Sequence, residues 1–202
     1  MAMNDLNLPI PKQDMCAVIL AGGDSQRMGQ DKSLLAINGI PLIQHIFTHL
    51  SDWFAEIVIS TNEPDRYQFI NCQVIPDEIT GQGPLMAIYS VLKSLGKPLF
   101  VMATDIPDIP VNILESILKL THENPASQVI LPITSRGEYE PLFAVYRPEI
   151  LPAMESALER GQRHIYGLFT EGPITTYTLQ PDESIPNLNR PADVTRFMDS
   201  RR

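Results

Sequence analysis

The run LAGGDSQRMGQDKSLL at positions 20–35 contains the residues best suited to chemistry in this chain. A stretch of apolar residues ends at the pair Gly22 and Gly23, and two separated cations, Arg27 and Lys32, follow. Because glycine lacks a Cβ atom, such a loop can present backbone N–H groups to an anion at close range. The cations beyond the loop could then reach the outer phosphates of the same ligand. This pattern predicts the phosphate-binding loop of a nucleotide-using enzyme.

Two well-known phosphate-binding motifs do not fit the same run. A P-loop requires Gly-Lys followed by Ser or Thr, whereas Asp31 precedes Lys32 here. A dinucleotide-binding fingerprint requires Gly-x-Gly-x-x-Gly, a spacing that Gly22, Gly23 and Gly29 do not have. A plain turn between a strand and a helix would account for the glycines but not for the nearby cations. We therefore expect both cations to neutralise charge on the β- and γ-phosphates of a bound nucleotide.

A single carboxylate, Asp105, follows a second apolar stretch at residues 98–103. Mg²⁺ in nucleotide sites is held by one or two carboxylates together with phosphate oxygens, so a carboxylate at a strand end beside a phosphate loop is the expected ligand. The alternative role is a helix N-cap, for which Asp108 lies closer to the helix start expected at Pro110. We therefore predict that Asp105 binds the metal and that Asp108 caps the helix.

The elements that must position these residues alternate between apolar strand-like stretches and amphipathic helical stretches. Strands are expected at residues 16–21, 56–61, 73–76, 98–103, 128–132, 141–146 and 174–179. Helices are expected at residues 41–52, 64–70, 84–95, 110–121, 148–160, 163–169 and 191–199. This order predicts a mostly parallel twisted sheet in a single three-layer α/β/α domain. Ligands of such sheets bind beyond the carboxyl ends of the strands, where the glycine loop, Asp77 and Asp105 would converge.

The bulk properties of the chain limit the classes of protein that it can be. With 202 residues, of which 44% are hydrophobic, it suits one compact domain, which we place at residues 15–202 after a flexible tail at residues 1–14. The net charge of −9 argues against a general nucleic-acid-binding protein. No apolar run reaches the ~20 residues that a membrane span needs, and the first residues lack the features of a signal peptide. We therefore expect a cytoplasmic enzyme whose partners include neither a membrane nor a nucleic acid.

The glycine-loop pattern, Leu-Ala-Gly-Gly-x-Ser-x-Arg-Met-Gly-x-Asp-Lys, resembles the molybdenum cofactor guanylyltransferase family of nucleotidyltransferases. Three later segments support the resemblance in the expected order: Gly-Pro-Leu at 83–85, Thr-Asp-Ile-Pro at 104–107 and Asn-Leu-Asn-Arg-Pro at 187–191. The resemblance covers about residues 15–199 and implies a fold like that of the glycosyltransferase-A enzymes. It also implies that Asp105 binds Mg²⁺.

The same resemblance assigns binding residues by their positions in these motifs. It implies that GTP is bound by Leu20, Ala21, Gly22, Gly23, Lys32, Ser60, Asp77, Gly83 and Asp105. It implies that the second, phosphorylated substrate faces Asn187 and Asn189. Asp77 would recognise guanine, because a carboxylate can accept hydrogen bonds from both N1–H and the exocyclic amine of that base. Two positions depart from the family: Ser60 stands where an asparagine is common, with Asn62 two residues on, and Ala87 stands where glycine is usual.

The reaction implied by the resemblance is transfer of GMP from GTP to the terminal phosphate of Mo-molybdopterin, with release of pyrophosphate. That phosphomonoester is already ionised at neutral pH, so no general base is needed, and catalysis would rest on Arg27, Lys32 and Asp105 with Mg²⁺. Arg136 and Arg163 are candidates for holding the acceptor's phosphate, on charge alone. Other cofactor-biosynthesis proteins and molybdoenzyme chaperones are the further partners expected.

Two other functions fit the same residues. A cytidylyltransferase that acts on molybdopterin or on another phosphorylated acceptor would use the same loop and metal, although the Leu-Ala-Gly-Gly sequence and Asp77 modestly favour guanine. A non-catalytic nucleotide-binding or cofactor-delivery protein would keep the pocket without turnover, which the presence of both Lys32 and Asp105 disfavours. Parallel assays with GTP and CTP test the first alternative, and pyrophosphate release tests the second.

Overall fold

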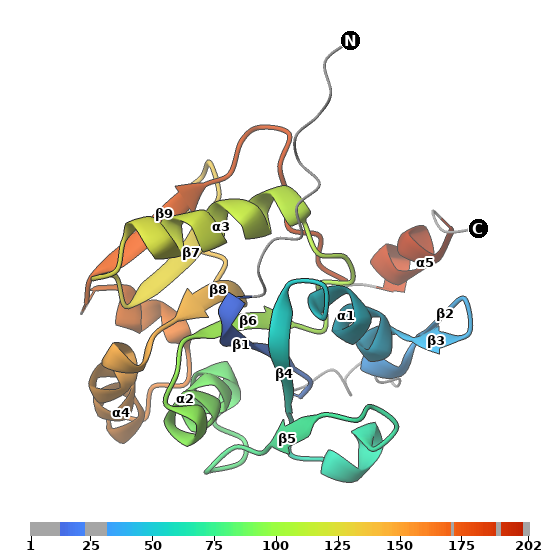
Figure 1. Ribbon diagram of the computed structural model, residues 1–202, viewed down its shortest axis with the longest axis horizontal. Coiled ribbons are helices and arrows are strands. Elements are labelled where there is room, and N and C mark those ends of the chain that lie inside the picture. The colour runs from blue at the N-terminus through green and yellow to red at the C-terminus, as the bar shows by residue number, and fades with distance from the viewer. Residues whose placement is uncertain (1–12, 23–31, 171, 189–190, 200–202) are drawn as a thin grey trace.

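The computed structural model in Figure 1 describes residues 13–22, 32–170, 172–188 and 191–199. Within these ranges, apolar runs rich in Val, Ile and Phe form a seven-stranded sheet in the order β5-β4-β1-β6-β8-β7-β9. Its strands are β1 (Gln13–Leu20), β4 (Phe54–Ser60), β5 (Gln73–Ile75), β6 (Leu99–Ala103), β7 (Val129–Ile133), β8 (Phe143–Tyr146) and β9 (Ile174–Thr178). Pairing is parallel except where β8 runs antiparallel to β6 and β7. The expected mostly parallel sheet is therefore confirmed.

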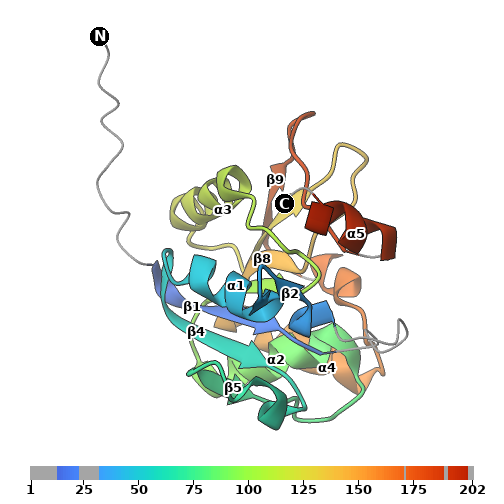
Figure 2. The same ribbon diagram turned by 90° about the vertical axis from the view of Figure 1, so that its right-hand side faces the viewer.

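Helices cover both faces of the sheet, which gives three layers (Figures 1 and 2). One face packs against α1 (Leu42–Leu50) and α3 (Val111–Glu123), with Phe197 of α5 (Pro191–Asp199) against the same core. The other face packs against α2 (Gly83–Leu95) and α4 (Leu151–Glu159). None of the helices in the described ranges is long and apolar enough to cross a membrane.

Three of the expected helices take a different form. The stretches expected at 64–70 and 163–169 are short 3-10 helices, η3 (Pro64–Tyr67) and η5 (Ile165–Thr170). The helix expected at 148–160 is divided into η4 (Pro148–Ile150) and α4. Pro152 lies in the first turn of α4 and has no N–H to donate backwards, so the regular helix can begin only there.

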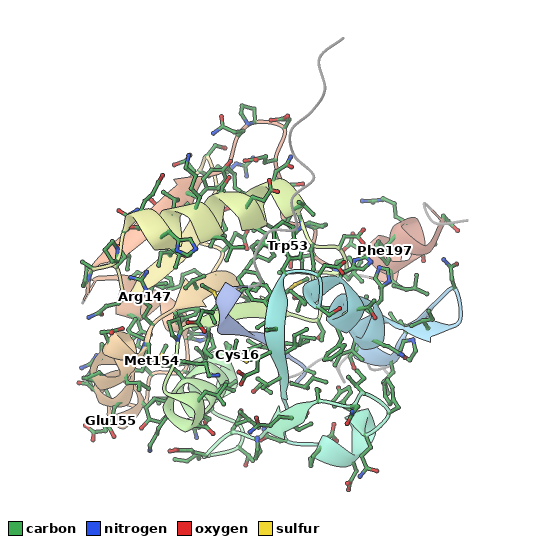
Figure 3. The ribbon with its side chains drawn as sticks, in the orientation of Figure 1. Cys16, Trp53, Arg147, Met154, Glu155 and Phe197 are labelled. Carbon is green, nitrogen blue, oxygen red and sulfur yellow. The ribbon has the colours of Figure 1, made fainter. Side chains whose placement is uncertain are left out.

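Alternate residues of β1 face opposite cores. Ala17 and Ile19 belong to the core beneath α1 and α3, whereas Cys16 and Val18 belong to the core beneath α2 and α4. All four are fully buried. Burial raises the pKa of the Cys16 thiol to about 12, so this cysteine, labelled in Figure 3, stays protonated and serves as a small core residue.

Four parallel strands end in a single row. Leu20 of β1 pairs with Ser60 of β4 and with Ala103 of β6, and Ser60 pairs in turn with Ile75 of β5. Backbone hydrogen bonds continue just past the row, as from the Ala21 N–H to the Ser60 carbonyl at 2.9 Å. Because these strands end in register, the loops after them leave the sheet at one edge.

A small hairpin links the glycine-rich region to α1. It begins after the short 3-10 helix η2 (Lys32–Leu34) and consists of β2 (Ala36–Ile37) and β3 (Ile40–Pro41). Its turn residues Asn38 and Gly39 have φ values of 50° and 82°, the positive values that a tight hairpin turn requires. This hairpin is not among the strands expected from the sequence.

Candidate active site

Four parallel strands end side by side, and two residues after the last residue of each strand the chain lines a common cavity. The residues at these positions are Gly22, Asn62, Asp77 and Asp105, and they follow β1, β4, β5 and β6 respectively. The cavity has a volume of about 310 Å³. Its other lining residues are Leu20, Ser60, Thr61, Gly81, Gly83, Pro84, Ala87, Ala103, Thr104 and Leu142. The structure therefore brings the expected nucleotide residues Leu20, Gly22, Ser60, Asp77, Gly83 and Asp105 together around one space.

Asp105 has the properties of a cation ligand. Its Oδ1 atom is buried and has no hydrogen-bond partner among the described residues. Burial raises the pKa of Asp105, while the charge of Lys32 and a backbone N–H lower it. An unpaired buried carboxylate oxygen is unfavourable unless a cation or another donor meets it. The described ranges contain no group of three or more His, Cys, Asp and Glu side chains that could hold a metal ion.

Lys32 and Asp105 are linked by hydrogen bonds to the same residue, Leu188. The Lys32 Nζ atom donates a hydrogen bond to the carbonyl of Leu188. The N–H of Leu188 in turn donates to the carbonyl of Asp105 at 2.7 Å. The C-terminal segment thus holds the ends of η2 and β6 together. Three of the expected site residues, Gly23, Arg27 and Asn189, lie outside the described residues.

Asp77 is held by Asn62 at two points. The Asn62 amide nitrogen Nδ2 donates to Asp77 Oδ2 at 2.9 Å, and the backbone N–H of Asp77 donates to Asn62 Oδ1 at 3.0 Å. Burial raises the pKa of Asp77, and the hydrogen bond from Asn62 lowers it. From the sequence, Asn62 was expected only as a neighbour of Ser60, without a role of its own. Strand register was the missing signal, because it shows that Asn62 rather than Ser60 occupies the position equivalent to Asp77.

Gly83 and Ala21, two of the residues expected to bind GTP, differ in their relation to the cavity. Gly83 begins α2 with a φ of +75°, and a Cβ atom there would lie 3.2 Å from the Arg163 carbonyl oxygen. Glycine accommodates both the positive φ and this close approach without strain. Ala21 is buried in the hydrogen-bonded strand ends and is absent from the lining of the cavity. Its side chain belongs instead to the hydrophobic core that packs against α1 and α3.

A second cavity of about 200 Å³ adjoins the first. Pro84, Asp105 and Leu142 line both of them. The remaining residues of the second cavity are Ile106, Glu140, Pro141, His164, Ile165, Tyr166 and Asn187. Burial, Glu138 and Asp105 all raise the pKa of Glu140, so the carboxylates here repel one another. Asn187, expected to face the second substrate, lies in this cavity, whereas Arg136 and Arg163 line neither one.

The expected capping role of Asp108 is wrong. The N-cap of α3 is Pro110, and no side chain caps it. Asp108 instead lies near α1, with its Oδ1 atom 3.8 Å from Nε2 of His45. Pro110 lies two residues after Asp108 and has the extended backbone of an N-cap, so Asp108 does not occupy the position from which a side chain would cap α3.

The fold and this edge of the sheet are those of a nucleotidyltransferase: parallel strand ends surround a cavity that carries a lone buried carboxylate, with a lysine beside it. The sequence profile described as the MobA-like NTP transferase domain matches residues 17–173. The chain belongs to this family, as its motifs indicated.

The alignments with similar proteins span nearly the whole chain. A Carboxydothermus hydrogenoformans protein named probable molybdenum cofactor guanylyltransferase is 30% identical over 194 residues, which cover 92% of this chain and 96% of that protein. A molybdenum cofactor guanylyltransferase of Vibrio atlanticus is 34% identical over 187 residues, or 89% and 93% of the two chains. The crystal structure of molybdopterin-guanine dinucleotide biosynthesis protein A from Archaeoglobus fulgidus superposes with a TM-score of 0.78 at 23% identity, covering 92% and 98%. These likenesses confirm the expected fold.

Proposed function

We propose that this chain transfers GMP from GTP to the terminal phosphate of Mo-molybdopterin, which forms the molybdopterin guanine dinucleotide cofactor and releases pyrophosphate. The observation that carries the proposal is the place of Asp105 on the wall shared by two cavities. Nucleotidyl transfer requires two phosphate groups to meet at one centre of positive charge. A carboxylate with a buried, unpartnered oxygen at that junction suits a cation that both substrates approach.

The larger cavity would take GTP. Its base would lie toward Asp77, where a carboxylate can accept from N1–H and the 2-amino group of guanine. Its triphosphate would lie toward Gly22 and Asp105, within reach of Lys32. Arg27, from the same glycine-rich run, would add a second cation at the departing pyrophosphate. Mg²⁺, held by Asp105, would supply charge neutralisation at the phosphate oxygens.

The smaller cavity would take the phosphate end of the acceptor. Asn187 lies there, and Asn189 follows it in the same Asn-x-Asn element. An ionised oxygen of the acceptor phosphate would attack the α-phosphorus of GTP, forming one P–O bond while the bond to the β-phosphate breaks. No proton needs to move, because a phosphomonoester is largely a dianion at neutral pH. The chain's residues therefore need to orient the reactants and hold charge, with no general base.

The proposal is tested by pyrophosphate release from the full chain with molybdopterin, a divalent cation and either GTP or CTP. We expect release with GTP at a kcat/KM at least tenfold above that with CTP, because cytosine does not offer two adjacent donors to Asp77. Preference for CTP would identify a cytidylyltransferase and refute the proposal. Tight GTP binding without pyrophosphate release would identify a binding or delivery protein instead. Omitting Mg²⁺, or replacing it with Mn²⁺, tests the metal separately.

The remaining parts of the proposal concern its cellular setting. We place the reaction in the cytoplasm, where GTP is available. The product would then pass to other cofactor-biosynthesis proteins or to molybdoenzyme chaperones. Co-purification of tagged chain with labelled dinucleotide cofactor, followed by transfer to a molybdoenzyme in trans, would test that step.

A further inference from the structure

We infer that Asn62 is a positioning residue for Asp77, and that it thereby sets the selectivity of the site for the nucleotide base. The inference rests on the proposed use of GTP. The two residues exchange two hydrogen bonds, of 2.9 Å from the Asn62 amide to the Asp77 carboxylate and 3.0 Å from the Asp77 N–H to the Asn62 amide oxygen. One asparagine therefore fixes both the backbone and the carboxylate of Asp77.

The register of the sheet places the two residues opposite each other. Ser60 of β4 pairs with Ile75 of β5, and Asn62 and Asp77 each follow two residues later. The ladder extends one step beyond the strands, through the hydrogen bond of 3.2 Å from the Thr61 N–H to the Ile75 carbonyl. The turn after Asn62 is fixed too, because the Thr61 hydroxyl accepts from the Glu63 N–H at 3.2 Å. Beyond the end of the β4–β5 backbone pairing, hydrogen bonds of the Asn62 side chain therefore connect the two segments.

The segment that carries Asp77 is anchored from its other side by α2. The N–H of Glu78 donates to the Ser90 hydroxyl at 2.9 Å, and that hydroxyl donates to the Met86 carbonyl at 2.8 Å. Lys93 of the same helix pairs with the Glu78 carboxylate at 2.9 Å. Asp77 therefore lies between two fixed supports, of which only Asn62 touches its carboxylate. A carboxylate held in place before the ligand arrives loses less freedom on binding, which favours selective recognition.

The hydrogen-bond pattern leaves room for a base. Among the described residues, Asn62 is the one hydrogen-bond donor to the Asp77 carboxylate, and it donates to Oδ2. An ionised carboxylate has about four acceptor positions, so positions remain for two donors from a ligand. Guanine offers such a pair in N1–H and the 2-amino group. Asn62 also favours the ionised form that this recognition needs, because its hydrogen bond opposes the effect of burial on the pKa of Asp77.

The test compares GTP with inosine triphosphate (ITP), which lacks the 2-amino group, and with 2′-deoxy-GTP, which alters the sugar alone. We expect the full chain to prefer GTP to ITP by about tenfold in kcat/KM, since one hydrogen bond to a charged group is lost. Asn62→Ala should reduce that preference to roughly twofold, mainly by raising the KM for GTP, with kcat changed less. Asn62→Asp should remove the preference, because two carboxylates would face each other. Exposed Asn112 on α3 provides the matched control, and Asn112→Ala should keep the wild-type ratio.

The outcomes separate this inference from the proposed function. Preference of the unmodified chain for CTP would refute the use of GTP itself. Normal use of GTP, with an unchanged GTP-to-ITP ratio in both Asn62 variants, would overturn only the role of Asn62. A ratio that changes for 2′-deoxy-GTP but not for ITP would also overturn it, because Asp77 would then face the ribose. If either variant loses turnover, calorimetric binding of GTP and ITP gives the same comparison.

Discussion

The backbone N–H of Leu188 donates to the carbonyl oxygen of Asp105 at 2.7 Å, and the carbonyl of Leu188 accepts a hydrogen bond from Lys32. One residue of the C-terminal segment therefore links the backbone of Asp105 to the side chain of Lys32, the two residues that supply the carboxylate and the cation of the proposed reaction. The same contact sets Asn187 against the second cavity. A lysine ammonium has three donor hydrogens, so Lys32 can keep its bond to Leu188 and still donate to a phosphate.

Replacing Lys32 with methionine should reduce pyrophosphate release from GTP by about 100-fold or more, because a fixed positive charge at the departing phosphates is lost. Stability should change little, by roughly 1 kcal/mol in urea unfolding, since one partly buried hydrogen bond disappears. Exposed Lys119 supplies the control, and Lys119→Met should retain full activity. Activity of Lys32→Met within threefold of the unmodified chain would contradict the proposed role.

Asp105→Asn should abolish turnover and yet leave the metal-free protein as stable as before or more so. The pKa of Asp105 in the folded chain is raised by burial, so the fold favours the protonated form and ionisation at neutral pH works against folding. The neutral amide removes that penalty. Thermal unfolding without divalent cations should therefore give an equal or higher Tm for the variant, and a clearly lower Tm would argue against this account.

The same carboxyl predicts a pH dependence of metal binding. Only the ionised form of Asp105 can bind a cation, and its raised pKa means that it becomes protonated at a higher pH than an ordinary aspartate. The stabilisation of the chain by Mg²⁺ with GTP should therefore be complete above that raised pKa and be lost as the pH falls through it. Tm measured with and without Mg²⁺ and GTP at several pH values checks this, with Asp105→Asn showing no such dependence on the metal.

The positions of Asp77 and Asp105 at one sheet edge follow from local patterns, because an apolar run followed by a polar residue marks the end of a buried strand. The contact between Asn62 and Asp77 does not follow from such patterns, since it depends on the register between β4 and β5. The second cavity could not be predicted from local patterns either, because Glu140 and Tyr166 come from distant segments that join Asp105 around it only after folding. The hairpin at Asn38 was foreseeable, because Asn-Gly between short apolar runs is a strong turn signal.

Gly81 and Gly83, which both line the larger cavity, allow the effect of backbone strain to be measured apart from that of steric crowding. Gly81 and Gly83 have nearly the same φ, +76° and +75°, but a Cβ atom would meet the Arg163 carbonyl at 3.2 Å only at Gly83. Gly81→Ala should cost about 1 kcal/mol in urea unfolding from strain alone. Gly83→Ala should cost about 1 kcal/mol more and should raise the KM for GTP, because α2 must shift at the cavity wall. Equal losses of stability in the two variants would show that the contact with Arg163 is unimportant.

Arg147 holds the end of α3 and the loop after it. Its guanidinium donates to the carbonyls of Thr121 at 2.6 Å, Asn124 at 3.0 Å and Ser127 at 2.9 Å, and also to that of Pro125. Figure 3 shows this side chain close to the left-hand end of α3. The last carbonyls of a helix have no partners within it, and a cation there also opposes the helix dipole. The single side chain of Arg147 thus donates hydrogen bonds to several backbone carbonyls that would otherwise need water as a donor.

Arg147→Lys should lower the free energy of unfolding by about 2 kcal/mol, because an ammonium cannot reproduce the planar fan of donors that contacts four carbonyls. Catalysis should stay within twofold of the unmodified chain, since neither Arg147 nor the residues whose carbonyls it contacts line either cavity. Exposed Arg160, which donates to the Ser156 hydroxyl at 2.7 Å, is the matched control, and Arg160→Lys should change stability by less than about 0.5 kcal/mol. Equal effects of the two substitutions in urea unfolding would mean that water replaces the guanidinium at the end of α3 without loss.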